Sequence, residues 1–162
     1  MLEKIQCIGG HSLFSRNKNS TVPSIEEIEV GKKLSLTEKI KDRDLLLYLG
    51  LTNDSNPVYI QHAYCRETTL EKPIVPSIML VGLISAAISK YLPGPGAYII
   101  EQQVQLKQVV YHDETLQIFL EVVHKDSQLN EVTIEAKLWD EQKRIVLEGK
   151  FVVALPYLKE RE

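Results

Sequence analysis

The chain has 162 residues, of which 44% are hydrophobic and 25% are charged, and its formal net charge is −3 at pH 7. This length fits one domain with its own core, and the composition argues against a disordered chain. The slight negative charge argues against a nucleic-acid-binding protein, which needs a broad basic surface. No apolar run reaches the roughly 18 residues of a membrane-spanning helix, and the first residues lack a signal-peptide pattern. We therefore expect a cytoplasmic protein without a membrane partner.

The first 25 residues differ from the rest of the chain. A Gly-Gly pair and a polar stretch over residues 15–21 predict a loop that ends near Pro23. We therefore expect an N-terminal arm or extension over residues 1–25 and a single domain over residues 26–162. Only two cysteines are present, Cys7 and Cys65, which favours reduced thiols over a disulfide framework.

Two helices are predicted in the first half of the domain. Asp42 is a candidate N-cap for a leucine-rich helix over residues 42–49. Either Gly50 or the polar loop at residues 52–57 would end this helix. A second, shorter helix is expected over residues 61–68.

The most informative predicted element is a helix over residues 77–91. Almost every residue in it is apolar or small, which is typical of a helix buried on all sides. Pro73 and Pro76 bracket an extended segment before it, and Ser77 is its candidate N-cap. The sequence Leu-Pro-Gly-Pro-Gly at residues 92–96 ends it.

Alternating apolar and polar residues predict strands after this helix, with stretches centred on residues 104–106, 116–122, 132–138 and 145–153. Their close spacing favours an antiparallel meander, with a bulge at Gly149. The fold class is therefore α+β. One long buried helix followed by a curved antiparallel sheet is the ground plan of the hotdog fold, in which the sheet wraps the helix.

Three sequence blocks carry a family resemblance: D-S-N-P-V-Y at residues 54–59, K-P-I-V-P-S at 72–77 and L-P-G-P-G at 92–96. Together they resemble the MaoC-like (R)-specific enoyl-CoA hydratases, whose signature runs D-x-N-P-x-H, then P-I-V-H-G-M, then L-P-G-x-G. The resemblance covers about residues 28–157. It implies a hotdog fold and an acyl-CoA or acyl-carrier-protein substrate. We predict no cofactor, and because the histidines lack ligand spacing, no metal.

The sequence departs from the family pattern at functional positions. Asp54 matches the family aspartate, which activates a water together with a histidine, but Tyr59 stands in place of that histidine. Gln61 stands where many members have a second aspartate. Pro76 and Ser77 replace the His-Gly pair, whose glycine N–H polarises the thioester carbonyl. The Ser77 N–H at a helix start can keep that role.

Each of these residues also has a purely structural interpretation. Asp54 and Asn56 are common turn and cap residues, although the three blocks in register favour a pocket. Tyr59 either plugs the pocket as a core aromatic residue or holds a water, and the sequence does not distinguish the two. Ser77 is either a cap alone or a cap whose N–H also faces the substrate.

Other reactive side chains favour ordinary structural roles. His62 and Cys65 have the i,i+3 spacing of a nucleophilic pair, but neighbours on a helix surface are the favoured interpretation. Arg66 and Lys72 are candidates to meet the phosphates of CoA, with solvated charges favoured.

The resemblance implies reversible hydration of trans-2-enoyl thioesters to (R)-3-hydroxyacyl thioesters, with Asp54, Tyr59, Asn56 and Ser77 at the site. The replacement of histidine leaves open an impaired enzyme. It also leaves open a non-catalytic acyl-CoA-binding module, or a partner of a catalytic hotdog chain in a heterodimer. A thioesterase is less favoured, because the helix over residues 77–91 has no carboxylate to direct water. We expect a homodimer joined through sheet edges.

Overall fold

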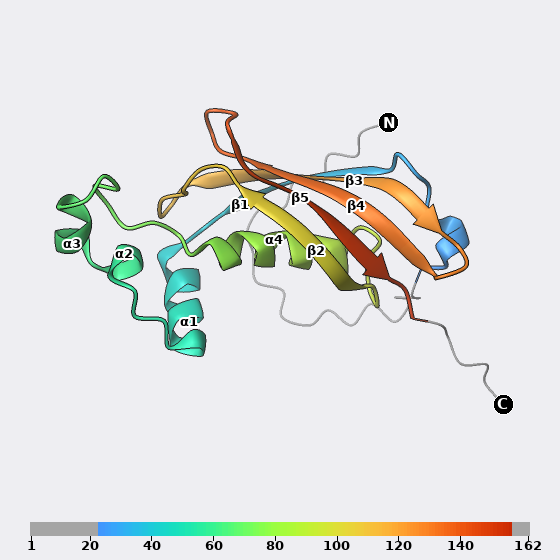
Figure 1. Cartoon of the computed structure of the whole chain (residues 1–162), viewed down its shortest axis with the longest axis horizontal. Coiled ribbons are helices and arrows are strands. Elements are labelled where there is room, and N and C mark those ends of the chain that lie inside the picture. Colours follow the sequence, from blue (N-terminus) through green and yellow to red (C-terminus); the bar gives the residue numbers. More distant parts are fainter. Residues whose placement is uncertain (1–22, 157–162) are drawn as a thin grey trace.

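The computed structural model describes residues 23–156, which form one curved sheet, a central helix and a group of short helices beside them (Figure 1). The helical elements are η1 (Ile25–Glu27), α1 (Asp42–Thr52), α2 (Pro57–Ile60), α3 (His62–Arg66) and α4 (Ser77–Lys90). The strands are β1 (Lys33–Lys39), β2 (Tyr98–Leu106), β3 (Thr115–Asp126), β4 (Glu131–Trp139) and β5 (Ile145–Ala154). None of the helices in the described part of the chain is long and apolar enough to cross a membrane.

The five strands form one antiparallel sheet in the order β1-β3-β4-β5-β2. Strands β3, β4 and β5 follow one another as the predicted meander. The prediction was wrong for β2, which pairs with β5 and not with β3. Helix α4 crosses the concave face before β2 begins, so the chain enters the sheet on the far side of the meander (Figure 1). The sequence analysis did not predict β1, which forms the other edge.

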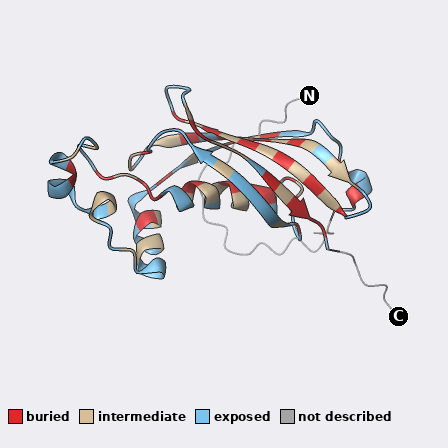
Figure 2. Cartoon of the chain, viewed as in Figure 1, coloured by how far each residue is buried: buried red, intermediate tan, exposed pale blue. Residues whose placement is uncertain are grey.

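Alternation of side chains places one face of the sheet in the core. In β4 the even-numbered residues Val132 to Leu138 are buried and the odd-numbered ones are partly exposed, as expected for a strand with one solvent-facing side. Figure 2 shows this alternation as bands along the strands. The buried face packs against α4.

Helix α4 supplies the other half of the core, as predicted. Its buried residues Leu80, Ile84, Ala87 and Ile88 recur every three to four positions and form one stripe. The predicted burial on all sides was wrong, because Ile78 is 51% exposed and Gly82 and Ser89 are exposed as well. Pro76 is the N-cap and Ser77 is the first helical residue, so the predicted cap was displaced by one position.

Gly149 is not a bulge. It pairs in register with Ala136 on one side and with Val104 on the other. A Cβ atom at this position would lie 2.6 Å from the Gln103 carbonyl oxygen and 3.2 Å from the Val104 Cα. Glycine is therefore required here by the close approach of β2, not by an irregular backbone.

Helices α1, α2 and α3 lie beyond one end of α4, away from most of the sheet (Figure 1). Lys41 is the N-cap of α1, so the predicted cap, Asp42, is instead the first helical residue. The helix ends at Thr52, and the C-cap Asn53 has a left-handed backbone conformation. The predicted helix over residues 61–68 corresponds to α3, and the short helix α2 that precedes it was not predicted. The two are separated at Gln61, whose extended backbone (φ −107°, ψ 99°) interrupts the helical path.

The predicted N-terminal arm lies mainly outside the described residues. Ile25, its last residue, is 7% exposed and belongs to the hydrophobic core. The division at residue 25 therefore remains a prediction from the sequence.

Candidate active site

The loop before α2 is ordered by its own side chains. The Asn56 N–H donates to Asp54 Oδ1 at 3.1 Å, and the Val58 N–H donates to Asn56 Oδ1 at 3.3 Å. Asn56 is thus the N-cap of α2, and Pro57 at the first helical position suits the fixed φ of proline. The turn interpretation of Asp54 and Asn56 therefore applies to their local geometry. It leaves one Asp54 oxygen without a hydrogen-bond donor in this loop.

Tyr59 is the residue of α2 that reaches the site. Its partial burial raises the pKa of the phenol above its ordinary value, and the nearby Asp54 carboxylate and Tyr48 hydroxyl raise it further. Burial and a neighbouring negative charge both disfavour a phenolate. Tyr59 is therefore a neutral hydroxyl at physiological pH, able to donate or accept a hydrogen bond but unable to act as a strong base.

A short extended strap, residues 74–75, joins α2 to the segment that follows β2. The Ile74 N–H donates to the Val58 carbonyl at 3.0 Å, and the Val75 N–H donates to the Val110 carbonyl at 2.7 Å. The strap leads directly into Pro76 and α4. These bonds hold Tyr59 and the N-terminus of α4 on opposite sides of the same strap.

The Lys72 side chain braces the approach to this strap. Its ammonium lies 4.3 Å from the centre of the Tyr111 ring, and the Tyr111 hydroxyl donates to the Leu70 carbonyl at 3.1 Å. The exposed lysine thus has a cation–π partner within the chain. Its predicted contact with CoA phosphate stays a prediction, as does that of Arg66.

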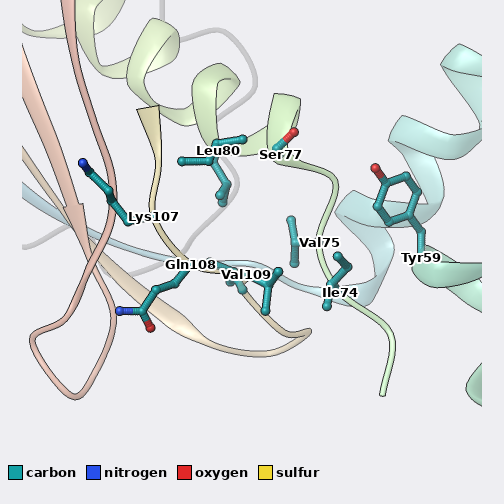
Figure 3. A pocket seen from close by; sticks show the side chains of 10 residues that line it. Tyr59, Ile74, Val75, Ser77, Leu80, Lys107, Gln108 and Val109 are labelled. Atoms are coloured by element: carbon teal, nitrogen blue, oxygen red, sulfur yellow. The ribbon is translucent and has the colours of Figure 1, made fainter. Parts of the chain in front are cut away.

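A cavity of about 320 Å³ opens between α2, the strap, the start of α4 and the end of β2. Its lining residues are Tyr59, Ile74, Val75, Ser77, Leu80 and residues 106–110. Figure 3 shows the Tyr59 hydroxyl directed toward the α4 side of the cavity, with Leu80 and Val75 nearer its interior. The wall is mostly apolar and carries a few polar groups, as is usual for a ligand site.

Of the four predicted site residues, Tyr59 and Ser77 line this cavity together. Asp54 does not line it, but the carboxylate is close enough to Tyr59 to raise the pKa of the phenol. Asn56 does not line it either and is exposed. Ser77, as the first residue of α4, has a backbone N–H without an intrahelical acceptor, so this donor is available at the cavity.

The His62 and Cys65 side chains follow the structural interpretation. The Cys65 residue is fully buried, and its thiol lies 3.6 Å from the Val58 carbonyl oxygen and 3.8 Å from that of Pro57. His62 is exposed. The thiol fastens α3 against α2.

Sequence reasoning missed most of the residues that shape the cavity, notably Leu80 and the segment over residues 106–110, which contributes both apolar and polar side chains. The three-residue spacing between Ser77 and Leu80 was the available signal, since it puts both on one side of a helix. Within residues 23–156, no three His, Cys, Asp or Glu side chains gather closely enough to hold a metal ion.

Comparison with known proteins agrees with this architecture. The model of the MaoC like domain matches residues 25–143. The chain belongs to the MaoC-like domain family. The (R)-specific enoyl-CoA hydratase of Rhodospirillum rubrum is 30% identical over 131 residues, which cover 81% of this chain and 90% of the relative.

Solved structures of MaoC-like relatives share the fold. The (R)-hydratase from Aeromonas caviae, involved in PHA biosynthesis, superposes with a TM-score of 0.77 at 25% identity, covering 81% of this chain and 99% of that one. An R-hydratase from Pseudomonas aeruginosa has a TM-score of 0.76 at 30% identity, covering 86% and 93%. The α+β class and the hotdog fold predicted from the sequence are confirmed.

Proposed function

We propose that this MaoC-like protein catalyses the reversible hydration of trans-2-enoyl thioesters to (R)-3-hydroxyacyl thioesters. The observation that carries the proposal is the cavity that Tyr59 and Ser77 line, with Asp54 beside it in the position of the family aspartate. Family membership and similarity to (R)-specific enoyl-CoA hydratases support the reaction class. The thioester is carried by CoA or by an acyl carrier protein.

In this mechanism Asp54 acts as the general base. Its carboxylate removes a proton from a water molecule while the water oxygen bonds to C3 of the substrate. The electron pair of the double bond moves to C2, and the charge spreads to the thioester oxygen. The carboxyl group then returns a proton to C2, so one oxygen–carbon bond and one carbon–hydrogen bond form across the double bond.

The remaining residues position groups around this step. The Ser77 N–H, at the positive end of α4, donates to the thioester oxygen as negative charge develops on it. The neutral Tyr59 hydroxyl holds the attacking water. Asn56 is a positioning residue, because its cap on α2 fixes the orientation of Tyr59 relative to Asp54.

The product analysis tests the reaction class. Purified protein is incubated with crotonyl-CoA and with a longer trans-2-enoyl-CoA, and the products are separated and their configuration determined. Hydration predicts (R)-3-hydroxyacyl-CoA without free thiol. Release of CoA thiol would instead indicate a thioesterase, for which α4 offers no carboxylate.

The second candidate function is a non-catalytic acyl-thioester-binding module, which includes a heterodimer partner of a catalytic hotdog chain. Tyr59 favours it, because a neutral phenol replaces the base that the family uses. Binding of butyryl-CoA without hydration of crotonyl-CoA, by a protein whose Asp54→Ala variant is equally inactive, would favour this candidate.

A homodimer formed through β2 is part of the proposal. Strand β2 pairs with β5 along one edge only, and most of its residues are exposed, including Tyr98 and Ile100. An unpaired edge with apolar side chains is a template for pairing with a second copy. Light scattering should give twice the mass of one chain, and a monomeric mass would contradict this arrangement. The cytoplasmic location stays a prediction from the sequence.

A further inference from the structure

A tight turn at residues 70–72 leads into the strap that joins the two halves of the site. The Lys72 N–H donates to the Leu70 carbonyl at 2.7 Å, and Glu71 between them has a φ of 63°. A hydrogen bond across two positions around a positive φ is the geometry of the rare, strained kind of γ-turn. A residue with a side chain keeps such a backbone conformation only where the surrounding contacts hold it.

One tyrosine from the segment after β2 supplies these contacts. The Tyr111 hydroxyl donates to the Leu70 carbonyl at 3.1 Å, from 41 positions away in the chain. The Lys72 ammonium lies 4.3 Å from the centre of the Tyr111 ring, and the Tyr111 backbone forms an antiparallel bridge with Ile74. Tyr111 therefore contacts alternate positions on both sides of Glu71.

The hydrogen bonds inside the turn are local. The Leu70 N–H donates to the Thr68 hydroxyl at 3.1 Å, that hydroxyl donates to the Cys65 carbonyl at 2.8 Å, and the Glu71 N–H donates to the Thr68 carbonyl at 3.3 Å. Bonds between positions two or three apart fix the shape of the turn. They do not fix its direction relative to the cavity, whereas a bond from Tyr111 does.

The strap carries that direction to both predicted site residues at the cavity. The Ile74 N–H donates to the Val58 carbonyl at 3.0 Å, directly before Tyr59, and Ser77 follows Ile74 by three positions. A shift of the turn therefore moves the Tyr59 hydroxyl and the Ser77 N–H relative to each other. A misplacement of about 1 Å between reacting groups can cost about 10²-fold in rate.

We infer that Tyr111 is a positioning residue, which holds the turn at Glu71 and thereby sets the Tyr59 hydroxyl and the Ser77 N–H in register with the substrate. This inference rests on the proposed function. Tyr111 does not line the cavity, so it acts through the strap. Loosening the strap weakens interactions made in the transition state, which lowers kcat and kcat/KM together and leaves KM nearly unchanged.

The test compares three variants in the hydration of crotonyl-CoA. Tyr111→Phe keeps the ring beside Lys72 but removes the donor to Leu70, and Tyr111→Leu removes the ring as well. Tyr64→Phe is the matched control, because Tyr64 is 47% exposed on α3 and does not line the cavity. If Tyr111→Leu does not fold, Lys72→Met removes the cation from the ring instead.

The expected losses lie in kcat. Tyr111→Phe should lower it about 3- to 10-fold and Tyr111→Leu about 10- to 100-fold, with KM within about 2-fold of wild type. Tyr64→Phe should stay within about 2-fold in both. A Tyr111→Leu protein with the kcat of wild type, or one that loses kcat/KM only through KM, overturns the inference.

A double-mutant cycle distinguishes positioning from general destabilisation. If Tyr111 acts partly through the Tyr59 hydroxyl, Tyr111→Leu should cost at least 2-fold less in a Tyr59→Phe protein than in wild type. A purely structural role predicts the same cost in both proteins, and that result would contradict a positioning role.

Amide hydrogen exchange reports the strap independently of turnover. In Tyr111→Leu the Ile74 and Val75 N–H groups should exchange at least 10-fold faster than in wild type, while the Ile134 N–H in β4 should be unaffected. This result in a protein without any hydration supports the hold on the strap and contradicts the hydratase. Hydration by wild type with unchanged strap exchange in Tyr111→Leu does the reverse.

Discussion

Replacing Tyr59 by histidine should increase hydration of enoyl thioesters. The structure gives the reason: Tyr59 lines the cavity, and both its burial and the nearby Asp54 raise the pKa of the phenol above its ordinary value. The hydroxyl is therefore protonated when the substrate binds. Histidine would place a base of suitable strength on the same element, α2.

The size of the gain follows from protonation at pH 7. With a pKa of at least about 10, no more than about 0.1% of Tyr59 is ionised, whereas an imidazole with a pKa of about 6.5 is about three-quarters in its basic form. One positioned acid–base group typically contributes about 10²–10⁴ in rate. Because the new imidazole lacks a shell evolved to orient it, we expect the lower part of this range for Tyr59→His.

The assay is the initial rate of crotonyl-CoA hydration across pH 5.5–9, with Tyr59→Phe as the control. The histidine variant should gain a rate that falls below pH about 6.5 as the imidazole becomes protonated. Tyr59→Phe should lose roughly 2- to 10-fold, the equivalent of one ordinary hydrogen bond. A folded Tyr59→His protein that is no faster than Tyr59→Phe at any pH would refute the placement of Tyr59 beside the reacting water.

Two further predictions concern stability. Gly149→Ala should lower the free energy of unfolding by about 1–3 kcal/mol in denaturant titrations, because the new Cβ would lie 2.6 Å from the Gln103 carbonyl oxygen. Gly82→Ala should raise the free energy of unfolding by about 0.5–1 kcal/mol, because Gly82 lies in α4 with open space around it. Burial opposes ionisation of Asp140, but hydrogen bonds from the Arg144 N–H and guanidinium, at 2.8 and 2.7 Å, outweigh it and hold the pKa of this carboxyl below its ordinary value. A carboxyl group whose pKa is lower in the folded state stabilises the protein at pH values above its unfolded-state pKa of about 3.9, and this stabilisation disappears as the pH falls through the folded-state pKa. Asp140→Ala should therefore lower the free energy of unfolding by about 1–3 kcal/mol at pH 7 and by progressively less below pH 4. An equal loss at pH 7 and at pH 2.5 would contradict this prediction.

The sequence predicted those parts of the fold that have strong local signals. The apolar run of α4 and its Leu-Pro-Gly end determine that helix, and period-two alternation determines β3, β4 and β5. The position of β2 could not be predicted, because pairing with β5 depends on where α4 delivers the chain. The role of Gly149 was misread for a similar reason, since the close approach of Gln103 comes from a different strand.

The sequence predicted which residues belong to the candidate site, but it did not predict the cavity between them. The blocks at residues 54–59 and 72–77 identified Asp54, Tyr59 and Ser77, and the strap at residues 74–75 shows why these distant blocks meet. The N-cap of α4, which lies one position before the predicted one, and the place of the buried Leu80 in the cavity wall both depend on backbone geometry. Single-sequence patterns do not encode that geometry.

The most direct test of a one-carboxylate hydratase is kcat/KM for crotonyl-CoA of wild type against Asp54→Asn. Asp44→Asn is the control, because the Asp44 carboxylate accepts hydrogen bonds from the Lys41 N–H and Arg43 Nε at the start of α1 and does not line the cavity. The account predicts measurable hydration by wild type, a loss of about 10²–10⁴ in Asp54→Asn, and a value within about 2-fold of wild type for Asp44→Asn. Hydration that survives unchanged in a folded Asp54→Asn protein would contradict it.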